Sequence, residues 1–119
     1  MTSERRTTPR RSFSYHVRVL DDDTQKTMGH LVEMSAMGVQ LETTIPLPVD
    51  KDYFLRMELT SEIAPTNFIV FSARTKWCQP DKFTPNMYHC GFEITDMLPD
   101  DREIFQTMLV RFGKENKRT

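Results

Sequence analysis

Apolar and polar side chains alternate with a period of two through much of this sequence, which is the pattern of β-strands with one buried face. In residues 53–59 every second side chain is apolar, from Tyr53 to Leu59, and Arg56 and Glu58 stand between them. Alternation or a short apolar run predicts six strands, at residues 13–19, 27–34, 39–43, 53–59, 68–78 and 88–95. Since no helical pattern separates them, we expect an antiparallel barrel or sandwich.

Turn-forming residues separate the expected strands. Residues 21–24 are predicted to form a solvated turn, and residues 33–38 a tight connection. Ser35 favours a turn there, and Gly38 can adopt a positive φ and lets backbone approach closely. Prolines predict a loop at residues 45–48 and a hairpin loop at residues 79–86. In the strand at residues 27–34, four side chains are expected to share a face, namely Met28, His30, Val32 and Met34.

The last element changes to a helical period. Its apolar side chains fall on one helical face, at Ile104, Phe105, Met108, Leu109 and Phe112. Pro99 suits the first turn of this helix, and Gly113 is a suitable stop. The expected fold class is therefore all-β with one C-terminal helix that closes a barrel.

Charge is distributed unevenly along the 119 residues, although the net charge is only −1. The sums are +4 for residues 1–18, −8 for residues 19–110 and +3 for residues 111–119. A chain of this length is expected to form one domain, and we divide it into a flexible basic arm at 1–12, a folded domain at 13–113 and a disordered basic tail at 114–119. A small basic arm on an acidic body suits a compact anionic ligand better than DNA or RNA.

Other chemistry finds little support in the sequence. Cys78 and Cys90 lack the C-x-x-C spacing of a zinc site and are expected to be free, buried thiols. His16, His30 and His89 are scattered over three strands, so we expect no metal site and no enzymatic activity. The N-terminal residues lack the apolar region of a secretory signal, and no apolar run is long enough for membrane insertion, so the cytoplasm is the expected compartment.

Two short motifs lie on the arm and on a predicted turn. Arg6 and Arg10 form R-x-x-x-R, and residues 33–38 form E-x-S-x-x-G. A guanidinium can bind a phosphate or the O6 and N7 atoms of guanine with two hydrogen bonds, and it can stack on a base. In an extended arm, positions i and i+4 lie about 13 Å apart, which allows the two arginines to grip different parts of one ligand.

In these motifs and their spacing the sequence resembles the PilZ family, whose signature is R-x-x-x-R followed by [D/N]-x-S-x-x-G. The resemblance extends to the strand with Trp77, the strand with Gly91 and Phe92, and the helix at residues 99–102. It implies a six-stranded antiparallel PilZ-type split barrel with a C-terminal helix. It also implies a bacterial receptor for the second messenger cyclic di-GMP.

The resemblance carries specific roles onto this sequence. Arg6 and Arg10 would hold phosphate and guanine, Glu33 and Ser35 the guanine edge and a phosphate, and Gly38 the turn. Arg5 and Arg11 flank the arginine pair and are further candidates for the same site. Glu33 stands where the family has Asp or Asn, and its extra methylene is expected to weaken binding without abolishing it.

Three readings of the function follow. The leading one is a stand-alone cyclic di-GMP receptor that relays the signal to an unidentified downstream protein, with motility, biofilm or polysaccharide formation, or virulence as the output, and that is a monomer or weak dimer. The second is a degenerate PilZ domain that acts as a protein-interaction module. The third is a small barrel for single-stranded nucleic acid, which the −8 body disfavours. In each reading Trp77, Phe92 and the methionines are expected in the core.

Overall fold

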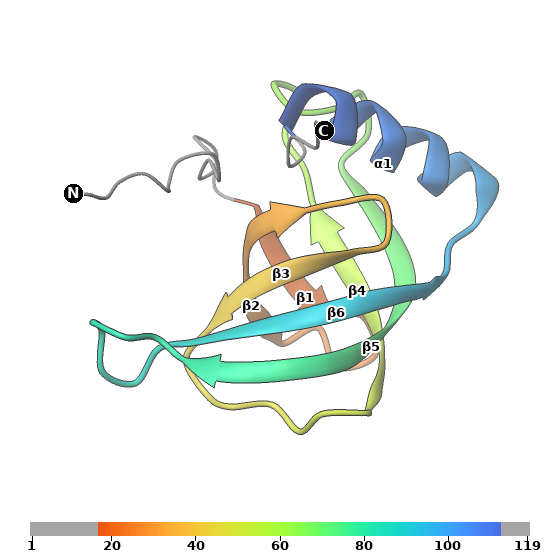
Figure 1. The fold of residues 1–119 in the computed structure, drawn as a ribbon. Helices are drawn as coiled ribbons and strands as arrows, with labels where there is room; N and C mark the ends of the chain where they lie inside the picture. Colours follow the sequence, from red (N-terminus) through yellow and green to blue (C-terminus); the bar gives the residue numbers. More distant parts are fainter. Residues whose placement is uncertain (1–16, 113–119) are drawn as a thin grey trace, which may run out of the picture.

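The computed structural model describes residues 17–112, which form six strands and one helix (Figure 1). The elements are β1 (Arg18–Asp21), β2 (Thr27–Met34), β3 (Gly38–Thr43), β4 (Asp52–Glu58), β5 (Phe68–Pro80), β6 (Tyr88–Asp96) and α1 (Pro99–Phe112). The strands close a barrel in the order β1-β2-β3-β6-β5-β4, and every neighbouring pair is antiparallel. The expected fold class is confirmed. The arm at 1–12, the start of the first expected strand, Gly113 and the tail at 114–119 lie outside the described residues.

Several strand ends differ from the expectation by one or two residues, including both ends of β4 and the start of β3. β1 continues to Asp21, which was assigned to the turn, and its pairing with β2 shifts between Val19 and Leu20. Both of these side chains are buried as a result. β5 continues past Cys78 to Pro80, and β6 reaches Asp96, so this hairpin is longer than the sequence pattern indicated.

Aspartate side chains close two of the hairpin loops. Asp21 Oδ1 accepts hydrogen bonds from the backbone N–H groups of Asp23 (2.9 Å) and Thr24 (3.3 Å). Asp81 Oδ1 does the same for the N–H groups of Phe83 (2.8 Å) and Thr84 (2.9 Å). Such turns satisfy backbone donors that the strands leave unpaired, which is why Asp is favoured at these positions.

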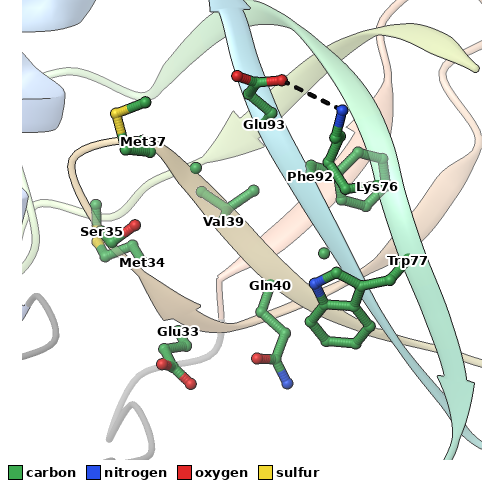
Figure 2. Close-up of a pocket in the computed structure, with 12 residues that line it drawn as sticks. Glu33, Met34, Ser35, Met37, Val39, Gln40, Lys76, Trp77, Phe92 and Glu93 are labelled. Carbon is green, nitrogen blue, oxygen red and sulfur yellow. Dashed lines mark ion pairs between the residues drawn. The ribbon is translucent and has the colours of Figure 1, made fainter. Parts of the chain in front are cut away.

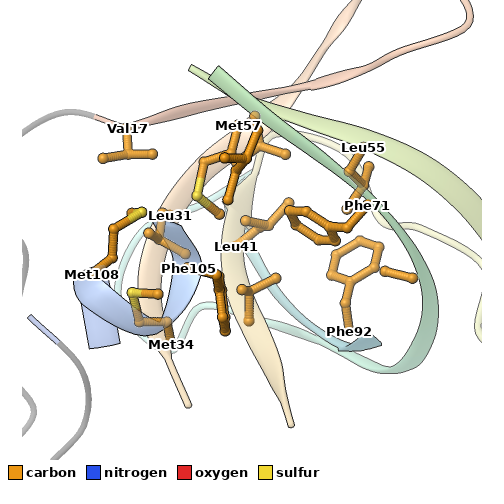
Figure 3. Close-up of a cluster of buried hydrophobic side chains, with 14 of the residues drawn as sticks. Val17, Leu31, Met34, Leu41, Leu55, Met57, Phe71, Phe92, Phe105 and Met108 are labelled. Carbon is orange, nitrogen blue, oxygen red and sulfur yellow. The ribbon is translucent and has the colours of Figure 1, made fainter. Parts of the chain in front are cut away.

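The inner face of the barrel and one face of α1 share a single apolar core (Figure 3). Phe105 and Met108 are buried, and the Phe105 ring lies 6.4 Å from the ring of Phe71 on β5. The remaining apolar residues of the helix, Ile104, Leu109 and Phe112, are partly buried against the same cluster. The predicted helical face is therefore confirmed, and α1 covers one end of the barrel (Figure 1). Within residues 17–112, no helix has the length and apolar character needed to cross a membrane.

The face predicted for β2 was wrong. Met28, His30 and Val32 are only partly buried, whereas Leu31 is 5% exposed and points to the core. The pairing of β2 with β3 shifts between Leu31 and Glu33, so one residue is inserted and Met34 faces inward again. A bulge of this kind reverses the side-chain alternation without any change in composition.

A candidate ligand groove across four strands

Strand register brings four residues into one row on the outer face of the barrel. Glu33 on β2 is paired with Gln40 on β3, Gln40 with Gly91 on β6, and Gly91 with Trp77 on β5. Directly paired residues of antiparallel strands present their side chains on the same face. The row therefore joins Glu33 from the turn motif to the tryptophan, which is 44 residues further along the chain.

Two bulges aim the ends of this row outward. Without the shift after Leu31, Glu33 would point inward, as Leu31 does. On β5 the pairing shifts between Thr75 and Trp77, so that Lys76 is the inserted residue and both Lys76 and Trp77 lie on the outer face. Bulges occur often beside binding sites because they redirect side chains in this way.

The missing side chain of Gly91 makes room for the Trp77 indole. A Cβ atom at Gly91 would collide with the indole ring, which therefore lies over the glycine backbone. Trp77 is 37% exposed, so its expected place in the core was wrong, whereas Phe92 is buried as expected. Met37, also expected in the core, is 69% exposed. An aromatic residue opposite a glycine on a neighbouring strand was the signal that could have identified this platform.

A groove of about 270 Å³ lies over this row and the adjoining β2–β3 turn (Figure 2). Glu33, Ser35 and Gly38 of the turn motif all line it, together with Met34, Met37, Val39, Gln40, Lys76, Trp77, Gly91, Phe92 and Glu93. Figure 2 shows the side chains of Glu33, Gln40 and Trp77 on the same side of the groove. Trp77 and Gln40 are groove residues that the sequence motifs did not include. The other predicted site residues, Arg5, Arg6, Arg10 and Arg11, lie outside the described residues.

Gly38 lies in the turn as expected, but it does not use the positive φ that glycine can adopt. No described glycine has a positive φ, so the turn does not require glycine for that reason. Instead, a Cβ atom at Gly38 would collide with the carbonyl oxygen of Phe92 on β6. The turn itself is closed by Ser35, whose N–H donates to the Gly38 carbonyl (2.9 Å) and whose carbonyl accepts the Gly38 N–H (3.4 Å). Glycine is needed here because β3 and β6 approach closely.

We therefore expect Gly38→Ala to destabilise the protein even without a ligand. The added methyl group must push β3 away from the Phe92 carbonyl, and overpacking of this kind costs about 1–3 kcal/mol. Urea unfolding of the ligand-free variant measures this loss. Ser35→Ala is the matched control in the same turn, since it leaves the backbone bonds in place. Equal stability of Gly38→Ala and wild type would contradict the close approach.

The described part of the groove does not by itself attract an anion. Glu33 and Glu93 contribute two negative charges, and Lys76 contributes one positive charge. The Lys76 Nζ atom lies 3.7 Å from Glu93 Oε1, so its charge is partly neutralised by this ion pair (Figure 2). A phosphate ligand would consequently need cationic groups from elsewhere in the chain.

Hydrogen bonds connect the Gln40 side chain through His89 to Asp81. His89 Nε2 lies 2.7 Å from Asp81 Oδ2, and His89 Nδ1 lies 3.3 Å from Gln40 Nε2. A carboxylate only accepts, so His89 Nε2–H donates to Asp81, and Nδ1 faces the Gln40 amide. Glu42, Asp81 and His89 place three possible metal ligands within 4.8 Å of one another. Both ring nitrogens of His89 are already engaged, one with Asp81 and the other with Gln40.

Asp81→Asn is expected to flatten the acid limb of the stability profile. The His89 hydrogen bond and the Phe83 and Thr84 N–H groups lower the pKa of Asp81 to about 2, from a usual 3.8. Its contribution to stability is therefore complete above pH 3.8 and is lost as the pH falls through about 2. Unfolding measured across this range should depend less on pH in the variant than in wild type. Asp23→Asn, in the exposed loop after β1, is the control and should leave the profile unchanged.

Comparison with known proteins places this fold. One solved structure with a similar fold is described as "Structure of Bacillus subtilis Inhibitor of motility (MotI/DgrA)", with a TM-score of 0.60 and 16% sequence identity. The match covers 92% of this chain and 51% of that one, so the present chain spans about half of its length. No curated protein matches this chain.

The family model of the PilZ domain matches residues 4–111, which include both motifs and all seven elements of the fold up to the last turn of α1. The chain therefore belongs to the PilZ domain family, a family of binding and adaptor domains.

Proposed function

We propose that this protein is a cyclic di-GMP receptor that binds its ligand between the groove and the arginines of the N-terminal arm. The observation that supports this most directly is the convergence of Glu33, Ser35 and Gly38 with Trp77 around one groove. Membership of the PilZ family supports the choice of ligand. Arg6 and Arg10 are the residues proposed to bind the phosphates and a guanine, and Arg5 and Arg11 flank them.

The groove offers complementary chemistry for one guanine. The Trp77 indole provides a flat surface on which a base can stack. The Glu33 carboxylate can accept hydrogen bonds from guanine N1–H and N2–H, and the Gln40 amide beside it both donates and accepts. The Ser35 hydroxyl is a candidate donor to a phosphate oxygen.

Size and charge both support the proposal that the arm contributes a second part of the site. The groove volume of about 270 Å³ is slightly smaller than the smallest usual ligand pockets, which measure about 300 Å³. The groove is therefore expected to hold only part of a dinucleotide. Carboxylates outnumber cationic groups in the groove, so two phosphates would need further counter-charge from elsewhere in the chain. Residues 1–18 carry a net charge of +4 and can supply it by folding over the bound ligand.

The proposed output is a change of surface that a downstream protein recognises. Ordering of the arm over the ligand would create that surface, and the protein would then act as an adaptor in the bacterial cytoplasm. The similar solved structure is an inhibitor of motility, which supports motility control as one output. Biofilm or polysaccharide formation and virulence are the other outputs expected of this family.

Isothermal titration calorimetry, with cyclic di-GMP added to the full chain, tests the proposal. Trp77→Ala removes the stacking surface and should weaken binding by about 5-fold to 150-fold, since stacking on an aromatic side chain contributes about 1–3 kcal/mol per base. Phe83→Ala is the control, because Phe83 is an aromatic residue that is 89% exposed in the β5–β6 loop and does not line the groove.

If the wild-type chain gives no heat of binding up to a high micromolar concentration of cyclic di-GMP, the proposal that it is a cyclic di-GMP receptor is rejected. The protein would then be assigned to the second reading, a PilZ domain that binds a protein without nucleotide. Glu33 in place of Asp or Asn and the excess of carboxylates in the groove are the two observations that favour this alternative.

A further inference from the structure

Two cysteines face each other across β5 and β6, one residue along from the Trp77–Gly91 pair of the groove. Cys78 and Cys90 are paired residues of these strands, and Cys90 is in turn paired with Leu41 on β3. Both are free thiols, as expected; Cys90 is fully buried and Cys78 partly buried. The Cys90 thiol donates a hydrogen bond to Cys78 Sγ, with 2.7 Å between the sulfur atoms. Spacing along the chain gave no sign of this contact.

We propose that Cys78 and Cys90 are a site of reversible oxidation, at which a hydroperoxide converts the two thiols into an intramolecular disulfide next to the Trp77–Gly91 pair of the groove. The geometry needs no rearrangement of the sheet. Directly paired residues of antiparallel strands have Cα atoms about 4.5–5.5 Å apart, which lies within the range of disulfides, about 4.4–6.8 Å. The proposal is independent of cyclic di-GMP binding.

The two thiols differ in reactivity, which sets the order of the steps. Cys78 is the more accessible of the two thiols, and its Sγ accepts a hydrogen bond from the N–H of Leu47 at 3.4 Å. Burial, followed by the hydrogen bond with Cys78, raises the pKa of Cys90 to about 11. Cys78 is therefore the attacking sulfur and Cys90 the resolving one.

The chemistry is balanced with one hydroperoxide. The Cys78 thiol gives up its proton and its sulfur attacks the terminal peroxide oxygen; the O–O bond breaks, and the leaving oxygen takes up a proton to give an alcohol or water, so that Cys78 becomes a sulfenic acid. Cys90 then attacks this sulfur; the S–S bond forms, the S–O bond breaks, and water leaves with the proton of Cys90. Two thiols are oxidised by two electrons, and the peroxide is reduced. A dithiol reductant reverses the change.

The disulfide would lie next to two groove residues in sequence. Trp77 precedes Cys78, and Gly91 follows Cys90, so the link would join the two strands at the point where the indole crosses the glycine. Trp77 is the one tryptophan of the chain, and disulfides quench nearby indole fluorescence. Its emission therefore reports the oxidation state of the pair.

Oxidation of the full chain with hydrogen peroxide tests the proposal. The intact mass should fall by about 2 Da for the two hydrogens lost, with both thiols disappearing together and Trp77 emission reduced, and dithiothreitol should restore all three. Trypsin cleaves after Lys76, Lys82 and Arg102, which places the cysteines on separate peptides, 77–82 and 83–102. Without reductant these two peptides should be recovered as one linked species.

Variants distinguish the pair from general oxidation. Cys78→Ala should leave the buried Cys90 as a thiol, and Cys90→Ala should allow Cys78 to gain oxygen atoms instead of losing hydrogen. The peptide map of wild type decides the question even if a variant fails to fold. A mass gain in wild type, loss of only one thiol, or a disulfide-linked dimer of two chains would overturn the proposal. None of these outcomes depends on whether the protein binds cyclic di-GMP.

Discussion

Replacement of both Arg6 and Arg10 by alanine is expected to weaken cyclic di-GMP binding by about 100-fold or more. A charge-assisted hydrogen bond contributes about 1.5–3 kcal/mol, so two arginines supply about 3–6 kcal/mol, and each 1.4 kcal/mol is a factor of ten. The groove cannot replace the lost arginines, since its own charged groups are two carboxylates and one ammonium group. Calorimetric titration of wild type and of Arg6→Ala/Arg10→Ala measures the difference.

The arm itself provides the matched control for this experiment. Arg5→Ala/Arg11→Ala also removes two positive charges from this segment, but it leaves the R-x-x-x-R pair of Arg6 and Arg10 intact. If Arg6 and Arg10 bind the ligand directly, the control should lose far less affinity than the test variant. Equal losses that disappear at high salt would assign the arm a general electrostatic role. Unchanged affinity in the test variant would refute the arm as part of the site.

Alternation was sufficient to predict most of the barrel because a closed antiparallel sheet buries one face of every strand. In β4, Leu55 and Met57 are fully buried and Arg56 between them is only partly buried, as the pattern requires. The prediction was wrong where the register shifts. The inserted residues, Val32 and Lys76, carry no composition that distinguishes them from ordinary strand residues. A bulge depends on the partner strand, which the local pattern does not contain.

The site could be predicted only in part for the same reason. Glu33, Ser35 and Gly38 are close in sequence and form a recognisable motif, and all three line the groove. Gln40 and Trp77 join them through pairings of β2 with β3, β3 with β6 and β6 with β5, which are properties of the closed barrel. The reason for glycine at position 38 was likewise tertiary, since it is the carbonyl of another strand that excludes a side chain.

Phe105→Ala is expected to reduce the free energy of unfolding by about 3–5 kcal/mol. The side chain is 1% exposed and packs beside Phe71, so its removal leaves a cavity between α1 and the barrel (Figure 3). Because a domain of this kind has about 5–15 kcal/mol of stability in total, the variant should unfold at a much lower urea concentration.

Val110→Ala is the matched control, since Val110 belongs to the same helix and is 87% exposed. Its stability should stay close to that of wild type, because alanine has the higher helix propensity and little burial is lost. A loss at Phe105 no larger than the loss at Val110 would mean that α1 is not part of the folding unit. No residue of α1 lines the groove, so Phe105→Ala should still bind cyclic di-GMP under conditions in which it remains folded. The helix would then be required for stability of the barrel, and the outer faces of β2, β3, β5 and β6, together with the arm, for recognition of the ligand.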